Sequence, residues 1–391
     1  MNVPLHDTLT AMRGLTFSCF PYLLVVAAAF LQGLALVLNC WHGVPAGNDF
    51  VMFHAAARSL LGGGSIYQPF LYVPYMHEAW LTGTAPGTGI VPLNLNPPIM
   101  SLLFLPLGLL PLRVAYMVSY IVQLLAALWV LRQLVRTMLP SSHSAFAWSA
   151  CSLLVYFPTF ANLYAGQVGL ALMAVLGLAT LALLKGHHRT AGIWLGLALT
   201  AKLFVGLIFV WLLWNRRWSS LTMGLMVWAM CMTVGFLLFG VGDHLHWISA
   251  MQENAQRALS WNGSLWALLA RNFPADQTGL GLVLALGIGL PVLAVLARQE
   301  PRFALAGLFP LMLLLSPLGW IYYFPVLIIS ALLLWPYQKG LLVAALALSA
   351  CPVPLMLPAG ITVATVYPFG LLFMVVAACY AGRSSSAQTG T

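Results

Sequence analysis

The chain has 391 residues, of which 62% are hydrophobic and only 6% are charged, whereas about 25% of residues are charged in typical soluble domains. A soluble protein of this composition could not cover its own surface with polar groups. The mean hydropathy is +0.95, and continuous apolar runs of about 20 residues, enough to span a bilayer as a helix, recur along the chain. Their continuity excludes a β-barrel, whose strands alternate, and the shortage of charge excludes a disordered chain.

The net charge is +9, from 16 Lys and Arg against 7 Asp and Glu. In a membrane protein this excess reflects the basic loops that stay on the inner side, so no nucleic-acid partner is expected. The six cysteines lie in or at the ends of apolar runs without metal-ligand spacing, and we interpret them as small apolar residues. The chain has no phosphate-binding loop, no dinucleotide fingerprint and no HExxH zinc motif, and we expect neither a metal nor a cofactor.

The apolar pattern predicts an all-α polytopic transmembrane bundle of about ten spans with additional re-entrant or interfacial helices. Residues 1–383 form one membrane domain in this interpretation, and residues 384–391 form a Ser-rich, disordered tail. In chain order the expected spans are 15–38, 114–135, 145–163, 168–184, 221–239, 280–297, 303–315, 321–335, 341–357 and 361–379.

Two further apolar segments are expected not to cross: residues 98–112 along the outer interface, and residues 191–214 as a re-entrant pair of half-helices meeting at Lys202. This arrangement puts 11 of the 16 basic residues inside and five of the seven acids outside. It predicts a bacterial-type plasma membrane protein with both termini in the cytoplasm and two long outer loops, 39–96 and 240–279. If both segments crossed once instead, the basic residues 132, 136, 185 and 189 would lie outside.

Two charged residues stand out within this apolar chain. Asp49 directly precedes an amphipathic stretch, residues 50–61, where it could cap a helix or act as a general base in a membrane-facing cavity. Lys202 has no acidic residue within a helical turn. Because a lysine at membrane depth is costly, it either extends toward the interface or contacts protein, water or an anionic ligand.

Four further polar residues have two interpretations each. Arg257 and Arg271, in the second outer loop, are interfacial arginines or clamps for a phosphate. Asn162 and Gln167 flank an outer helix turn and either cap helix ends or bind sugar hydroxyls. The His244-x-His246 pair supplies too few ligands for a metal site.

Several short segments follow one another along the chain in a characteristic order. They are Asp49-Phe50, the Ala-rich stretch 55–61 with its Gly-x-x-x-Tyr ending at Tyr67, Asn96-Pro97-Pro98, Leu105-Pro106-Leu107, Ala165-Gly166-Gln167-Val168, Lys202, Asn262-Gly263-Ser264-Leu265 with Arg271, and Ser316-Pro317-Leu318-Gly319-Trp320. Together they resemble the polyprenyl-phosphate-dependent membrane glycosyltransferases of the GT-C superfamily, specifically the family 87 α-mannosyltransferases.

The resemblance implies roles for individual residues. Asp49 would be the catalytic base that deprotonates the acceptor hydroxyl, and Lys202, Arg257 and Arg271 would hold the lipid phosphate. Sugar and acceptor contacts would come from Arg58, Tyr67, Asn96, Gln167, Asn262, Trp320, Tyr322 and Tyr323. The family commonly has a histidine shortly after the Trp of its Ser-Pro-x-x-Trp segment, whereas this chain has two tyrosines there.

The leading hypothesis is therefore an inverting glycosyltransferase that moves a hexose, mannose first, from a polyprenyl phosphate to an acceptor hydroxyl on the outer face. The lipid-linked sugar is a substrate, and the acceptor is a glycan or glycolipid in contact with membrane lipid. The alternative is a secondary transporter or flippase for a lipid-linked sugar. Such proteins often have internal repeats and acidic residues within their spans, and the sequence shows neither feature. A non-catalytic scaffold would leave the polar first loop unexplained.

Overall fold

The computed structural model describes residues 5–41, 49–67, 95–142, 144–252, 261–272, 278–352 and 366–389. The regular secondary structure in these ranges is helical. They also contain an isolated antiparallel β-bridge between Asn262 and Trp320. The all-α prediction is therefore confirmed.

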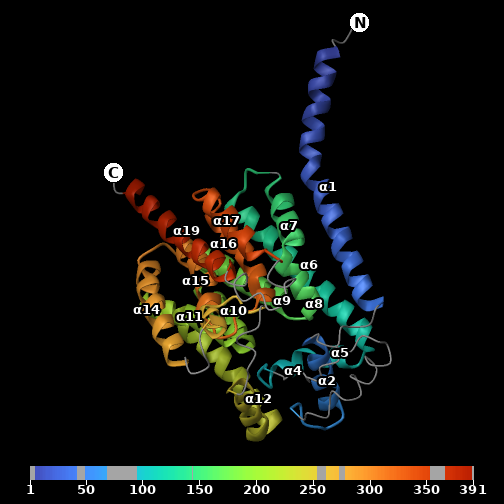
Figure 1. Cartoon of the computed structure of the whole chain (residues 1–391), viewed down its shortest axis with the longest axis vertical. Helices are drawn as coiled ribbons and strands as arrows, with labels where there is room; N and C mark the ends of the chain where they lie inside the picture. Colours follow the sequence, from blue (N-terminus) through green and yellow to red (C-terminus); the bar gives the residue numbers. More distant parts are fainter. Residues whose placement is uncertain are drawn as a thin grey trace.

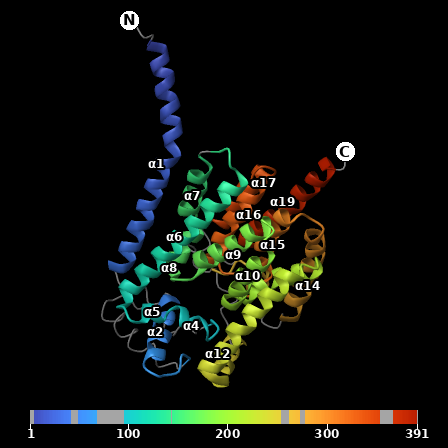
Figure 2. The ribbon, with the colours of Figure 1, turned by 180° about the vertical axis from the view of Figure 1, so that it is seen from behind.

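Four described helices are long and apolar enough to cross a membrane: α1 (Leu5–Trp41), α6 (Leu112–Met138), α12 (Trp218–Gln252) and α19 (Val366–Thr389). A fifth crossing results if α7 (Ala145–Val155) and α8 (Phe157–Ala165), which meet at a 51° bend, form one span. Helix α1 stands at one edge of the bundle, and its N-terminal half projects beyond the other helices (Figure 1, Figure 2).

The other apolar helices are shorter than a full crossing. They are α9 (Gly169–Leu184), α10 (His188–Ala201), η2 (Leu203–Val205), α11 (Gly206–Trp214), α15 (Pro301–Leu315), η4 (Ile321–Val326), α16 (Leu327–Leu334) and α17 (Lys339–Ser349), and in α14 (Thr278–Ala297) the apolar part is 283–297. The expected count of about ten spans is not confirmed, because polar residues, glycines and prolines divide the apolar runs into these pieces.

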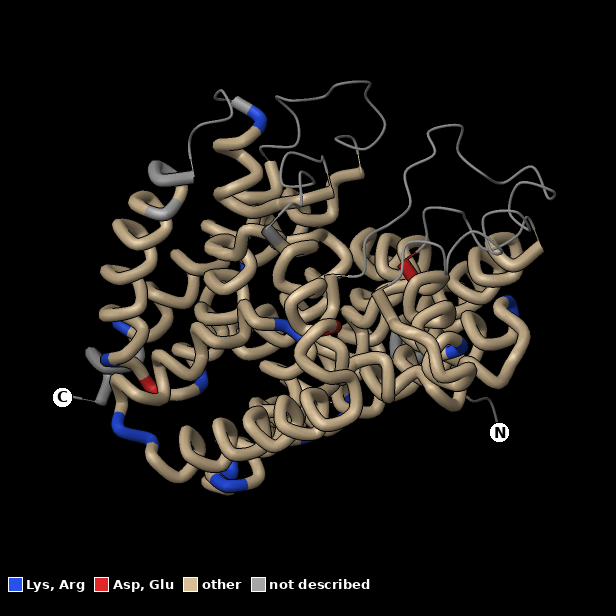
Figure 3. The backbone as a smooth tube through the Cα atoms, turned by 90° about the horizontal axis from the view of Figure 1, so that it is seen from below, with Lys and Arg blue, Asp and Glu red and all other residues tan. Residues whose placement is uncertain are grey.

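Helices α9, α15 and α16 form the centre of the bundle. All residues of α16 and twelve residues of α15 are buried, while α12 and α1 expose large apolar side chains along most of their length. Charged residues are sparse along the described part of the backbone, and many lie near helix ends (Figure 3). This distribution is the one expected when lipid, rather than water, surrounds the outer helices.

Close packing of α10 against α12 depends on two glycines. A Cβ atom at Gly192 would lie 2.5 Å from the carbonyl oxygen of Ser220, and one at Gly196 would lie 2.5 Å from that of Gly224. Small residues of this kind let two helix backbones approach closely in a membrane. The contact fixes α10, and thereby the position of Lys202 at its end.

Two segments were expected not to cross the membrane. Residues 98–112 contain only two four-residue helices, α4 (Met100–Leu103) and α5 (Leu105–Gly108), as expected for a segment that does not span. The segment 191–214 is broken at Lys202, which has an extended backbone, although its depth in a membrane stays a prediction.

Two stretches outside the predicted spans are helical. Much of the second outer loop, predicted at 240–279, is helical, because α12 continues to Gln252 after a kink at Gly240 and α13 (Leu265–Asn272) follows. Helix α19 extends to Thr389 into the predicted disordered tail, since no proline or glycine interrupts residues 383–389.

Candidate active site

A cavity of about 690 Å³ opens where six parts of the chain meet. Its walls are the start of α2 (Asp49–Leu61), the segment 95–97, the turn between α8 and α9, the break at Lys202 with the residues that follow it, the C-terminal end of α12, and the segment 312–323. Most of the lining side chains are apolar, including Met52, Phe204, Leu207, Val210, Ile248, Met251, Met312 and Leu315.

Asp49 is the first residue of α2 and borders the cavity. Its Oδ2 accepts a hydrogen bond from Nε2 of Gln167, whose side chain is buried in the turn after α8. Burial raises the pKa of Asp49 from 3.8 to about 6, and the Gln167 hydrogen bond and the positive charge of Lys202 oppose this rise. A carboxyl with this pKa is ionised at neutral pH and is a suitable general base.

Lys202 interrupts the helical chain between α10 and η2. Its Nζ donates a 2.8 Å hydrogen bond to Oδ1 of Asn96 and lies 4.9 Å above the ring of Tyr323. No ion pair joins Lys202 to Asp49 within the described part of the chain. The cavity therefore has a cation and a carboxylate that are separately held.

The segment after Trp320 supplies one wall of the cavity. Tyr322 and Tyr323 are buried there, and the hydroxyl of Tyr323 donates a 3.2 Å hydrogen bond to Oε1 of Gln167. The backbone carbonyl of Tyr322 accepts a 3.3 Å hydrogen bond from Nδ2 of Asn162. The wall is thus tied to the turn that carries Gln167.

Seven of the predicted site residues line this cavity: Asp49, Asn96, Gln167, Lys202, Trp320, Tyr322 and Tyr323. The others among them that the structure describes do not border it. Arg58 is exposed to solvent, Tyr67 donates to the backbone carbonyl of Asn96, and Arg271 donates a 2.9 Å hydrogen bond to the backbone carbonyl of Asn262. Arg257 lies outside the described residues.

Asn262 has a supporting position. Its Nδ2 donates a 2.8 Å hydrogen bond to the carbonyl of Pro317, and its Oδ1 accepts one of 3.2 Å from the backbone of Ser264. It is fully buried, and these contacts fix the segment 317–320, while its contact with a sugar stays a prediction.

The C-terminal end of α12 also lines the cavity and was not among the predicted site residues. Gly240 has φ +70° and ψ 177°, a conformation that favours glycine, and the resulting kink brings Trp247, Ile248 and Met251 to the cavity. Trp247 also donates a 3.2 Å hydrogen bond to the carbonyl of Leu95. The available signal was the apolar spacing of residues 241, 245 and 248, which fits one face of a helix.

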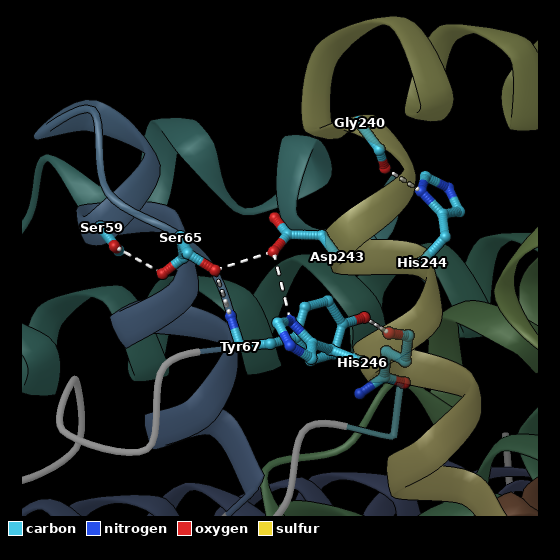
Figure 4. A network of polar contacts seen from close by, with 8 residues as sticks. Ser59, Ser65, Tyr67, Gly240, Asp243, His244 and His246 are labelled. Carbon is cyan, nitrogen blue, oxygen red and sulfur yellow. Dashed lines mark hydrogen bonds and ion pairs between the residues drawn. The ribbon is translucent and has the colours of Figure 1, made fainter.

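A polar network fastens this end of α12 to the loop after α2 (Figure 4). The hydroxyl of Ser65 donates a 2.8 Å hydrogen bond to Asp243, and His246 lies 4.0 Å from the same oxygen. His244 contacts the carbonyl of Gly240 at 2.8 Å. These contacts hold the kinked segment beside the helix that carries Asp49.

No cluster of three or more His, Cys, Asp or Glu side chains suited to a metal ion occurs in the ranges that the structure describes. The Asp243–His246 pair has no third such neighbour there. The arrangement of the cavity supports acid–base and electrostatic chemistry by Asp49 and Lys202.

The model of glycosyltransferase family 87 matches residues 94–317, more than half of the chain. The matched range contains Asn96, Gln167 and Lys202, while Asp49 and the two tyrosines of the cavity lie outside it. No curated protein matches the chain. The match, the helical membrane fold and the cavity agree, and the chain belongs to glycosyltransferase family 87.

Proposed function

We propose that this glycosyltransferase moves a hexose, mannose in the first instance, from a polyprenyl phosphate to an acceptor hydroxyl on the outer face of the membrane. The acceptor is a glycan or glycolipid, and the anomeric configuration inverts. The observation that carries the proposal is the charge of the cavity: Asp49 and Lys202 are the charged residues in its described lining, and no ion pair joins them.

Lys202 is the one cation among the described residues that line the cavity, and a single cation favours a phosphate monoester as the leaving group. One ammonium can neutralise one phosphate anion through a charge-assisted hydrogen bond. A diphosphate or a nucleotide carries more charge and is commonly held by several cations or by a metal. The rest of the lining is mainly apolar, which suits the lipid end of such a donor.

Access from the bilayer is consistent with the same substrate. Three apolar lining residues are partly exposed: Leu203 and Val210 are each 44% exposed, and Ile248 is 43% exposed. Apolar side chains of this kind would suit contact with a prenyl chain while the phosphate reaches Lys202.

The reaction needs only one protein base. The Asp49 carboxylate accepts the proton of the acceptor hydroxyl as the acceptor oxygen attacks the anomeric carbon. The bond between that carbon and the phosphate oxygen breaks, its electron pair leaves with the phosphate, and Lys202 stabilises the added negative charge. Attack opposite the leaving group converts a β-linked donor into an α-glycoside, and the phosphate leaves without a separate acid.

The test is transfer of radiolabelled mannose from polyprenyl-phosphate mannose to a membrane extract by the purified protein. Wild type, Asp49→Asn and the matched control Glu300→Gln are compared, because Glu300 is an acid outside the cavity lining. We expect a new labelled product with wild type and with the control, but not with Asp49→Asn.

Three other outcomes would change the assignment. Full transfer by Asp49→Asn would contradict the assignment of Asp49 as the general base. Movement of the labelled lipid across proteoliposomes without a covalent product would favour the flippase alternative. If only another lipid-linked sugar serves as donor, mannose is wrong and the cavity chemistry stands.

A further inference from the structure

The side chain of Gln167 bridges two other cavity residues. It is 5% exposed, its Nε2 donates to Asp49, and its Oε1 accepts from the hydroxyl of Tyr323. A carboxamide has one donating and one accepting end. Because Tyr323 donates to the oxygen, the amide nitrogen faces the carboxylate.

Tyr323 is itself held on several sides. It is 2% exposed, and its ring lies 5.4 Å from that of Phe204 and 4.8 Å from that of Tyr322 between ring centroids. The ammonium of Lys202 lies over its face. The ring has little freedom to rotate, so its hydroxyl is a fixed donor.

The contacts of Asp49 are asymmetric. Oδ2 accepts the bond from Gln167, whereas no described residue hydrogen-bonds to Oδ1. The charged or titratable groups that act on this carboxylate are Lys202, Tyr322 and Tyr323. Fixing one carboxylate oxygen orients the other, and orientation of this kind contributes directly to the rate.

We propose that Gln167 and Tyr323 are positioning residues for Asp49. Tyr323 fixes the amide of Gln167, and the amide fixes the carboxylate so that Oδ1 is available to the acceptor hydroxyl. This inference rests on the proposed function for the identity of the acceptor, but not for the arrangement of the three side chains. It replaces the direct sugar contact that the sequence suggested for both residues.

Tyr323→Phe is the informative variant, because it removes the hydroxyl and keeps the ring beneath Lys202. We expect kcat to fall about fivefold to tenfold, as for loss of one neutral hydrogen bond, while the KM for the donor stays unchanged. Once the amide can turn, its oxygen can face the carboxylate and disfavour the ionised form. The acid limb of the kcat/KM profile should therefore move to higher pH, and Gln167→Leu should move it in the same direction.

The matched control is Tyr156→Phe. This tyrosine is also buried, and its hydroxyl is hydrogen-bonded to Ser349 at 2.6 Å away from the cavity lining. Loss of its hydroxyl should lower the melting temperature and leave the pH profile in place. A shift in the control equal to that in Tyr323→Phe would make the effect a general result of destabilisation and overturn the proposal.

A second measurement needs no donor. In both the wild-type and the Tyr323→Phe background, the melting temperature is recorded from pH 4 to pH 8 for the protein with Asp49 and for its Asp49→Asn counterpart. The difference between the two melting temperatures changes with pH, and the midpoint of this change reports ionisation of Asp49. The midpoint should be higher in the Tyr323→Phe background than in wild type. An unchanged midpoint overturns the positioning role. A shifted midpoint in a protein that transfers no sugar supports it and rejects the proposed donor instead.

Discussion

Replacing Asp49 by asparagine should inactivate the protein and make it more stable at neutral pH. Burial raises the pKa of Asp49 from 3.8 to about 6, so folding favours the protonated carboxyl. Each pKa unit corresponds to about 1.4 kcal/mol, and the ionised carboxylate therefore destabilises the folded protein by up to about 3 kcal/mol above pH 6. Because part of Asp49 is open to the cavity, this value is an upper bound.

The sign of the pH dependence follows from the same pKa. Near pH 4 the carboxyl of folded Asp49 is protonated and the penalty is small, and it grows as pH rises toward 6. Asparagine has no charge to bury, and its side-chain oxygen can still accept the hydrogen bond from Gln167. The advantage of Asp49→Asn should thus be slight at pH 4, increase up to about pH 6, and stay constant at higher pH.

The measurement is thermal unfolding in detergent, followed by the fluorescence of the 14 tryptophans. The difference in melting temperature between the two proteins is compared across pH, so effects of other groups cancel. A variant that is less stable than wild type at pH 8, or a difference that does not vary with pH, would refute the buried-carboxylate reasoning.

Three other predictions follow from the cavity and its walls. In wild type, kcat/KM for transfer should fall about tenfold per pH unit below about pH 6, because the base must be ionised; a flat profile to pH 5 would contradict this. Lys202→Met should raise the KM for the donor by about 10- to 100-fold, the range for one charged hydrogen bond, with Lys202→Arg losing less, as donor titrations would show. Gly169→Ala should unfold or inactivate the protein, because its Cβ would lie 1.8 Å from the carbonyl oxygen of Tyr322, whereas Gly287→Ala, with no atom within 4 Å, should leave melting temperature and activity nearly unchanged.

The sequence predicted the class of fold and the two charges of the cavity. Asp49 and Lys202 were identifiable because charge is rare in this chain and costly in lipid. The break at Lys202 could also be predicted, since a helix that continued through it would place the ammonium among apolar side chains.

The connections within the cavity could not be read from the sequence. Gln167 is 118 residues from Asp49 and 156 from Tyr323, and its position depends on how α8, α9 and η4 pack. Arg271 was a candidate for phosphate because of its residue type, but it donates to the carbonyl of Asn262. The count of about ten spans is not confirmed, because length and hydropathy do not reveal where helices break.

A phosphate bound at Lys202 should change the pKa of Asp49, because Lys202 and Asp49 share one cavity. The positive charge of Lys202 lowers the pKa of Asp49 in the unliganded protein. A donor phosphate bound to Lys202 would offset that charge, so the pKa of Asp49 should be higher in the complex than in the free protein. The acid limb of the kcat profile reports the pKa in the complex, and the acid limb of the kcat/KM profile reports the pKa in the free protein. The acid limb of kcat should therefore lie at the higher pH. In Lys202→Met the positive charge is absent from both the free protein and the complex. The acid limb of kcat/KM should then move to higher pH, and the separation between the two limbs should depend on the phosphate alone. A kcat limb at the same or lower pH in wild type would mean that the phosphate does not bind beside Asp49.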